Sequence, residues 1–434
     1  MSELNPDISW RKGLLAVSPI IIFLLVYLLT SLVIGDFYKM PLSVAFLIAS
    51  VWAAFTLKDL SVGERIEIFS KGAASSNVLY MIWIFILAGA FASIAKSTGA
   101  VEATVNMALS VLPSSLIVPG LFVATCFISM AIGTSVGTVV AMTPLAVDIA
   151  MQINGEVAYF VAIVLGGAFF GDNLSFISDT TIAATRTQEC DMKDKFFANI
   201  KIVVPAAIMA LVLYCILSPE FSTIQISEHI SNWLILPYLL VIILAITGIN
   251  VVIVLLCGII SAVIVGVING QELMDMLFIA GEGVDSVGSL IIVTLLAAGM
   301  LGIIKHSGGI DFILRIVGHN IGTIRGAQSS IVLLVGIVNL CTANNTVAII
   351  TVGTLARNIS RHFHIPARKA ASLLDTGSCV VQALIPYGAQ TLMATSLAGI
   401  SPVAPWTYLF YPQCLIICLV VSIMIIGNKK GKLS

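Results

Sequence analysis

Residues 171–181 read GDNLSFISDTT and lie between apolar runs at 157–170 and 182–185. Seven of these eleven side chains are polar, and two of the seven, Asp172 and Asp179, are acidic. Within a bilayer each unsatisfied polar group costs several kcal/mol, so such a segment cannot face lipid. We expect it to be the broken middle of a spanning helix, enclosed by protein or by water. The alternative is a cytoplasmic loop with an aspartate cap before a short helix.

The composition of the chain is that of a membrane protein. Of 434 residues, 59% are hydrophobic and 10% are charged, whereas soluble domains carry about 25% charged residues. The net charge of -1 gives no attraction for nucleic acid. The eight cysteines form neither a CxxC pair nor a Cys/His cluster at metal spacing, so we interpret them as packing residues. No P-loop, GxSxG or HExxH pattern occurs, so neither ATP-driven transport, an enzyme activity nor a cofactor is expected.

Apolar stretches of spanning length recur along the whole chain. They lie near 14–34, 40–57, 78–95, 155–185, 200–219, 232–247, 249–268, 286–304, 366–398 and 405–427. Two further stretches, 114–152 and 328–359, are too long for one span and are interrupted by polar residues. Each is either two short spans or one re-entrant hairpin. The descending arm at 139–151 is short for a span, which favours re-entrance.

Basic residues gather beside the ends of these stretches and predict the orientation of the chain. The groups expected to be cytoplasmic are Arg11 with Lys12; Lys58, Arg65 and Lys71; Arg186, Lys193, Lys195 and Lys201; Lys305, Arg315 and Arg325; residues 357–369; and Lys429, Lys430 and Lys432. The connections near 97–113, 153–156, 219–231 and 399–404 hold almost no Lys or Arg and are expected to be external. Both termini are therefore predicted to be cytoplasmic.

An internal repeat supports the same layout. AGAFASIAKSTGAVE at 88–102 lies over AAGMLGIIKHSGGID at 297–311, and TTIAAT at 180–185 lies over QTLMAT at 390–395. A nearly constant offset also carries Thr134, Thr138 and Thr143 onto Thr342, Thr346 and Thr351. Each unit holds an odd number of spans, which places the second copy upside down.

The expected fold is thus an all-α polytopic membrane protein with two inverted repeats. It has about ten transmembrane helices plus two re-entrant hairpins, with broken helices at the midplane. The expected segments are a cytoplasmic N-terminus at 1–13, the first repeat at 14–219, an external linker at 220–231, the second repeat at 232–427 and a cytoplasmic tail at 428–434.

The broken segment has the composition of a cation site. Unwinding frees backbone carbonyls, which together with carboxylates and hydroxyls form a cage of hard oxygens suited to Na⁺. Burial favours the protonated carboxyl group and a bound cation favours the carboxylate, so Asp172 and Asp179 could each exchange a proton for Na⁺. The candidate cation and proton ligands are Asp172, Asn173, Ser175, Ser178, Asp179 and Thr180.

Both hairpin tips and the second broken helix supply further candidates. Small and amide residues at the tips suit half-helix N-termini that point toward an anion or a polar ligand, although they also suit close helix packing. Gln382 and Ala389 stand where Asp172 and Asp179 stand in the first copy, so the halves are not equivalent. Asp375 is either a third acid of the site or a helix-end residue near the cytoplasm. The candidate substrate ligands are Thr134, Ser135, Thr138, Asn344, Asn345, Thr346, Ser378 and Gln382.

The motif at 171–181 resembles the GDxxSPxSDTT pattern of the NhaC-type sodium/proton antiporter family. Matching positions are Gly171, Asp172, Ser175, Ser178, Asp179, Thr180 and Thr181, while Phe176 replaces the usual proline. The resemblance implies a fold of the broader ion-transporter superfamily, with two re-entrant hairpins and a scaffold that supports a moving transport unit. It also implies a choice of substrate, since relatives include sodium/proton antiporters, malate/lactate exchangers and amino-acid carriers.

Three functional hypotheses follow. The first is Na⁺/H⁺ antiport by alternating access, with Na⁺ held at Asp172 and Asp179. The second is Na⁺- or H⁺-coupled transport of a small amino acid or organic acid, including malate/lactate-type exchange. The third is a membrane scaffold or receptor that transports nothing, which leaves the acids in the spanning segment unexplained. The expected location is the bacterial cytoplasmic (inner) membrane. The expected partners are the lipid bilayer and small ions or solutes, no nucleic acid is expected, and a homodimer is left open.

Overall fold

Helices are the only regular secondary structure in the part of the chain that the computed structural model describes. The described residues are 9–34, 40–101, 103, 107, 116–176, 178–217, 232–247, 249–318 and 322–426. Within these ranges, eight apolar helical segments are long enough to cross a membrane, and four shorter apolar helices accompany them. The expected all-α polytopic fold is confirmed. The predicted linker at 220–231 and tail at 428–434, and most of the predicted N-terminal segment, lie outside the described residues.

The helices of the two halves follow similar but not identical orders in the described part of the chain. The first half has α1 (Trp10–Ile34), α2 (Leu42–Thr56), α3 (Val62–Ala73), α4 (Ser76–Ser97), α6 (Ile117–Ile132), α7 (Ser135–Gln152), α8 (Val157–Leu174), α9 (Asp179–Gln188) and α10 (Met192–Ile216). The second half has η2 (Asn232–Ile235), α11 (Leu236–Ile246), α12 (Val251–Ile268), α13 (Leu273–Ser286), α14 (Gly288–His306), α15 (Gly309–Gly318), α16 (Ile324–Thr342), α17 (Asn345–His362), α18 (Ala367–Leu384), α19 (Ala389–Ala398), η3 (Ala404–Tyr408) and α20 (Phe410–Ile426).

Each half folds its interrupted apolar stretch into a helical hairpin with a two-residue tip. In the first hairpin Gly133 ends α6 in the left-handed region and Thr134 caps α7. In the second, Ala343 ends α16 in the left-handed region and Asn344 caps α17. Thr134 therefore corresponds to Asn344, 210 residues later. The predicted pairing of Thr134 with Thr342 was wrong by two residues, because it followed a threonine spacing and not the positions at which the helices begin.

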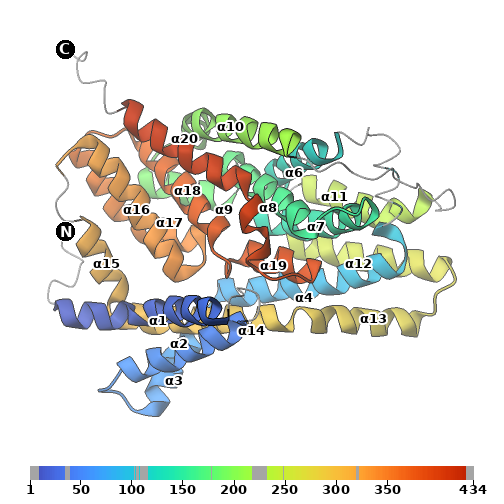
Figure 1. Ribbon diagram of the computed structural model, residues 1–434, viewed down its shortest axis with the longest axis horizontal. Coiled ribbons are helices and arrows are strands. Elements are labelled where there is room, and N and C mark those ends of the chain that lie inside the picture. The colour runs from blue at the N-terminus through green and yellow to red at the C-terminus, as the bar shows by residue number, and fades with distance from the viewer. Residues whose placement is uncertain are drawn as a thin grey trace.

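The hairpins approach the centre of the molecule from opposite ends. In Figure 1 the α6–α7 hairpin lies toward the right-hand end of the long axis and the α16–α17 hairpin toward the left-hand end. Their tips face the same space, since residues 133–136 and 343–346 line one cavity. The two inverted repeats with re-entrant hairpins are thereby confirmed, and the tips bring two remote parts of the sequence to one site.

A layer of long helices supports the hairpins. Figure 1 shows α1 to α4 with α12 to α14 beneath the hairpins and broken helices. In this layer α3 packs on α14 and α4 packs on α13. Each crossing brings two glycines into backbone contact: a Cβ atom on Gly72 would lie 2.8 Å from Gly302 Cα, and one on Gly89 would lie 2.3 Å from Gly283 O. Glycine is needed at these crossings because backbone atoms occupy the place of a side chain.

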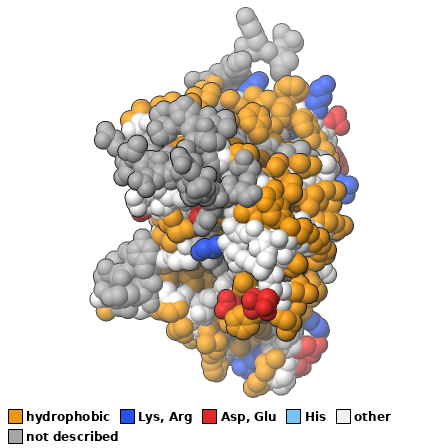
Figure 2. Space-filling model, turned by 90° about the vertical axis from the view of Figure 1, so that its right-hand side faces the viewer, with side chains coloured by type: hydrophobic (Ala, Val, Ile, Leu, Met, Phe, Trp, Pro, Cys, Tyr) orange, Lys and Arg blue, Asp and Glu red, His pale blue; other side chains and the backbone are white. Residues whose placement is uncertain are grey.

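The outer surface of the molecule is largely apolar. Large hydrophobic side chains such as Leu29, Val33, Phe55, Ile268 and Phe278 are more than half exposed. In Figure 2 hydrophobic side chains cover much of the coloured surface, and charged side chains occupy only a few places on it. Such a surface is stable in contact with lipid chains and unstable in contact with water, as expected for a multi-pass membrane protein.

Candidate ion-binding site

The helix that carries the motif at 171–181 is broken, as predicted. Helix α8 ends at Leu174 and α9 begins at Asp179. Hydroxyl groups satisfy backbone carbonyls that the break leaves free. Ser178 Oγ donates to Asp172 O at 2.9 Å, and Thr181 Oγ1 donates to Ser175 O at 2.8 Å. Ser178 also caps α9 by accepting from the Thr181 amide. The sequence therefore supplies the donors that a buried break requires.

The carboxylate of Asp172 lies between the two hairpin tips. The residue is 4% exposed. Its Oδ2 accepts hydrogen bonds from Ser135 Oγ at 3.0 Å and from Asn345 Nδ2 at 3.2 Å, and its Oδ1 accepts from Thr180 Oγ1 at 3.4 Å. Ser135 and Asn345 are the first residues of α7 and α17. The carboxylate thus faces the N-termini of two helices, where the helix dipole favours negative charge.

Two glutamines of the second broken helix extend this network. Gln390 Nε2 donates to Ser135 Oγ at 2.9 Å, and Gln382 Nε2 lies 2.9 Å from Gln390 Oε1. Gln382 Nε2 also donates to Ala343 O, in the second hairpin tip, at 3.1 Å. Both hairpins and both broken helices are therefore joined by hydrogen bonds around one carboxylate, and the amide of Gln382 occupies the position equivalent to Asp172.

A cavity of about 850 Å³ adjoins this network. The predicted site residues that line it are Thr134, Ser135, Asp172, Asp179, Thr180, Asn344, Asn345, Thr346 and Gln382. Asp179 is exposed, in contrast to the buried Asp172. From Asp179 the cavity follows one face of α9 to Arg186, and Tyr80 and Asn250 of α4 and the start of α12 line its opposite side. The cavity therefore lies between the supporting layer and the broken helices.

The other predicted site residues do not line the cavity. Their side chains bind backbone carbonyls nearby: Asn173 Nδ2 to Phe169 O, Ser175 Oγ to Met130 O, Ser178 Oγ to Asp172 O, Thr138 Oγ1 to Thr134 O and Ser378 Oγ to Asp375 O. These contacts stabilise the hairpin tip and the broken helices. Ion binding by these five residues stays a prediction.

A buried ion pair lies behind the site, and the sequence reasoning missed it. Lys195 Nζ is 2.7 Å from Asp375 Oδ2, and the two side chains are 1% and 0% exposed. Lys195 was predicted to belong to a cytoplasmic group of basic residues; its side chain is instead buried against Asp375, and the side of the membrane stays a prediction. Asp375 lies in the middle of α18 and not at a helix end. The sequence offered one signal, the acid Asp375 in the apolar part of α18, because a buried charge requires a partner; it did not show which base is that partner.

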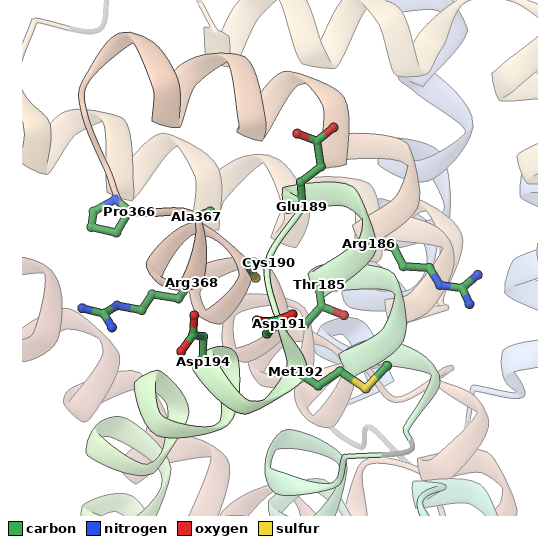
Figure 3. A pocket seen from close by; sticks show the side chains of 10 residues that line it. All are labelled: Thr185, Arg186, Glu189, Cys190, Asp191, Met192, Asp194, Pro366, Ala367 and Arg368. Atoms are coloured by element: carbon green, nitrogen blue, oxygen red, sulfur yellow. The ribbon is translucent and has the colours of Figure 1, made fainter.

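Arg186 also borders a second hollow of about 670 Å³, at the junction of α9, α10 and α18. Figure 3 shows the acids Asp191 and Asp194 in this hollow and the Arg186 side chain directed away from them. Glu189, on its rim, forms ion pairs with Arg357 and with Arg361 of α17, the latter at 2.7 Å. Burial raises the pKa of Cys190 to about 11, so its thiol is protonated at neutral pH.

The chain is similar to several characterised antiporters. It is 24% identical to the Na(+)/H(+) antiporter NhaC of Bacillus subtilis over 86% of this chain and 88% of that protein. It is 20% identical to the malate-2H(+)/Na(+)-lactate antiporter of the same species, over 95% and 94% of the two chains. It is 23% identical to the arginine/ornithine antiporter ArcD of Halobacterium salinarum, over 93% and 89%.

The model of the Na+/H+ antiporter family matches residues 12–218 and again residues 221–427. Two matches that together span nearly the whole chain agree with its duplicated architecture. With its broken acidic helix and paired hairpins, the chain belongs to the Na+/H+ antiporter family.

Proposed function

We propose that the protein exchanges Na⁺ for H⁺ by alternating access, with Asp172 as the group that carries either ion. The observation that carries the proposal is the buried carboxylate at the cavity wall, held by donors from both hairpin tips. Ser135 and Thr180 hydroxyls can donate to the carboxylate or offer an oxygen to a cation. Carboxylate, hydroxyl and amide oxygens are the ligands that a hard cation prefers.

The two acids of the cavity differ in their roles. Asp172 is enclosed and accepts three hydrogen bonds, which suits a group that alternates between two bound ions. Asp179 lines the same cavity and is exposed, which suits a group that attracts Na⁺ toward Asp172. Lys195 is neutralised by Asp375. The pair therefore adds no net charge beside the cavity.

The orientation of the protein follows from the basic residues near the end of the cavity. The cavity reaches Arg186 and Thr187 near the end of α9, and Arg357 and Arg361 of α17 pair with Glu189 just after α9. Under the positive-inside rule this face is cytoplasmic. The structure would then be the inward-facing state in the bacterial inner membrane, with cytoplasmic termini and with 14–219 and 232–427 as the two repeats.

Proteoliposomes with an internal pH dye test this proposal. Addition of Na⁺ should drive proton movement by the unaltered protein, and Asp172→Asn should abolish it because an amide cannot exchange a proton. Asp179→Asn should keep exchange but raise the KM for Na⁺. Asp194→Asn, in the second hollow, is a matched control and should leave exchange unchanged. Full exchange by Asp172→Asn would refute the proposal.

Arg186 favours a second candidate, exchange of a small organic or amino acid. Among the described residues no ion pair or hydrogen bond partner occurs for its guanidinium, although it lines a cavity that also holds two acids. A guanidinium in such a place can bind a substrate carboxylate. Counterflow of radiolabelled dicarboxylates and amino acids should then be detected and should be lost in Arg186→Gln. No uptake of any compound across the panel would leave Na⁺/H⁺ exchange alone.

A further inference from the structure

The ammonium group of Lys195 is enclosed by three oxygens. Its Nζ lies 2.9 Å from Asn173 O, 2.6 Å from Thr181 Oγ1 and 2.7 Å from Asp375 Oδ2. Asn173 O belongs to the last turn of α8 before the break, and Asp375 comes from the other repeat. This cage, formed by Asn173 O, Thr181 Oγ1 and Asp375 Oδ2, therefore adjoins the segment that carries Asp172.

All three oxygens act as acceptors. A backbone carbonyl has no proton to donate, the Thr181 hydroxyl donates its proton to Ser175 O, and Asp375 Oδ2 also accepts from Asn199 Nδ2 at 2.7 Å. Each contact therefore uses one N–H of Lys195. A neutral amine has only two N–H groups and an ammonium has three. The hydrogen bonding thus identifies the group in the cage as a cation.

The cage has the chemistry of a sodium site. A carbonyl next to a helix break, a hydroxyl and a carboxylate are hard oxygen ligands. Three further oxygens, Asn173 Oδ1, Asn199 Oδ1 and Asp375 Oδ1, are buried and without a hydrogen bond partner in the described part of the chain. Buried acceptors without a donor are rare in folded proteins. The residues around Lys195 therefore hold more acceptor oxygens than one ammonium uses.

We propose that this cage is a second cation site, which the chain fills with its own lysine. The inference rests on the proposed function and sets its stoichiometry: Na⁺ binds at Asp172 alone, so one Na⁺ moves in each cycle. Removal of the ammonium leaves Asp375 buried without a counter-charge, which is strongly unfavourable. Shortening Lys195 should therefore open the cage to Na⁺, which restores the charge balance.

The test uses the full chain with Asp172→Asn, so that binding at the proposed transport site is removed. In this background Lys195→Ala should bind radiolabelled Na⁺ saturably, with one ion per chain. Its thermal unfolding midpoint should rise in NaCl relative to choline chloride at equal ionic strength. Asp172→Asn alone should show neither effect. The control Asp172→Asn with Lys195→Ala and Asp375→Asn should also show neither, because the cage then lacks its charge.

Several results would overturn the proposal. The first is a Lys195→Ala variant that binds no Na⁺. The second is a Lys195→Ala variant whose thermal unfolding midpoint is no higher in NaCl than in choline chloride, or that is unfolded in both salts. The third is an unaltered protein that binds two Na⁺ per chain. One Na⁺ per unaltered chain supports it. No Na⁺ on the unaltered chain would refute Na⁺ binding at Asp172, and the cage would then stand or fall on the Lys195→Ala comparison alone.

Discussion

Substitution of Gly283 by alanine should loosen the supporting layer at the point where α13 crosses α4. A Cβ atom there would lie 2.4 Å from Gly89 O and 2.7 Å from Ser93 Oγ. The serine side chain can rotate, but the Gly89 carbonyl belongs to a helix backbone and cannot move without shifting α4. Such overpacking destabilises a protein by about 1–3 kcal/mol.

A second glycine of the same helix provides the control. A Cβ atom on Gly281 would meet nothing within 4 Å. Both substitutions gain the same helix propensity, about 1 kcal/mol, so the difference between them isolates the steric effect. The free energy of unfolding can be measured by titration with SDS in mixed micelles. Gly281→Ala should equal or exceed the unaltered protein, and Gly283→Ala should fall about 1–3 kcal/mol below Gly281→Ala. Equal stability of the two variants would show that the crossing is not tightly packed.

Three further predictions concern the site and the surface. Asn345→Ala removes a hydrogen bond that favours the Asp172 carboxylate over the protonated acid, worth about 1.5–3 kcal/mol, so the proton should compete better with Na⁺ and the KM for Na⁺ should rise by at most about 150-fold; an unchanged KM would separate this hairpin from the site. Glu189→Gln breaks exposed ion pairs and should lower the free energy of unfolding by at most about 1 kcal/mol. This loss should be smaller at high salt than at low salt when unfolding is measured in both. Hydrogen bonds from Ser61 lower the pKa of Glu64 below its ordinary 4.5, so their stabilising effect is present above that pH and is lost in acid. Ser61→Ala removes the hydroxyl that donates to Glu64 Oε2 and also accepts from the Glu64 amide, so it should speed hydrogen exchange in α3 at both pH values, and more so at pH 7 than when Glu64 is protonated; an equal effect at both pH values would contradict this assignment.

The sequence was sufficient to predict the architecture wherever a polar run interrupts an apolar one. The break between Leu174 and Asp179 was predictable because seven polar side chains in a short segment cannot face lipid. The two hairpins were predicted in the same way, from polar residues that interrupt the apolar stretches 114–152 and 328–359. The register between the repeats was harder, because the threonine spacing gives an offset two residues shorter than the one set by the caps Thr134 and Asn344.

The position of Lys195 could not be predicted from its neighbours. Lys193 and Lys201 flank it, and a lysine in such a run is normally exposed at the membrane interface. Its burial depends on Asp375, which is 180 residues away in the sequence and comes close only in the folded chain. The meeting of Ser135 and Asn345 at Asp172 also depends on tertiary structure, because the two donors belong to different repeats.

Asp172 accepts hydrogen bonds from both repeats, from Ser135 and Thr180 of the first and from Asn345 of the second, and so connects the two hairpin tips. If one hairpin shifts relative to the other, the carboxylate must give up Ser135 or Asn345. In the proposed mechanism, loss of either donor would change the affinity of the acid for its ion. Movement of a hairpin and release of the ion would then be coupled at one side chain.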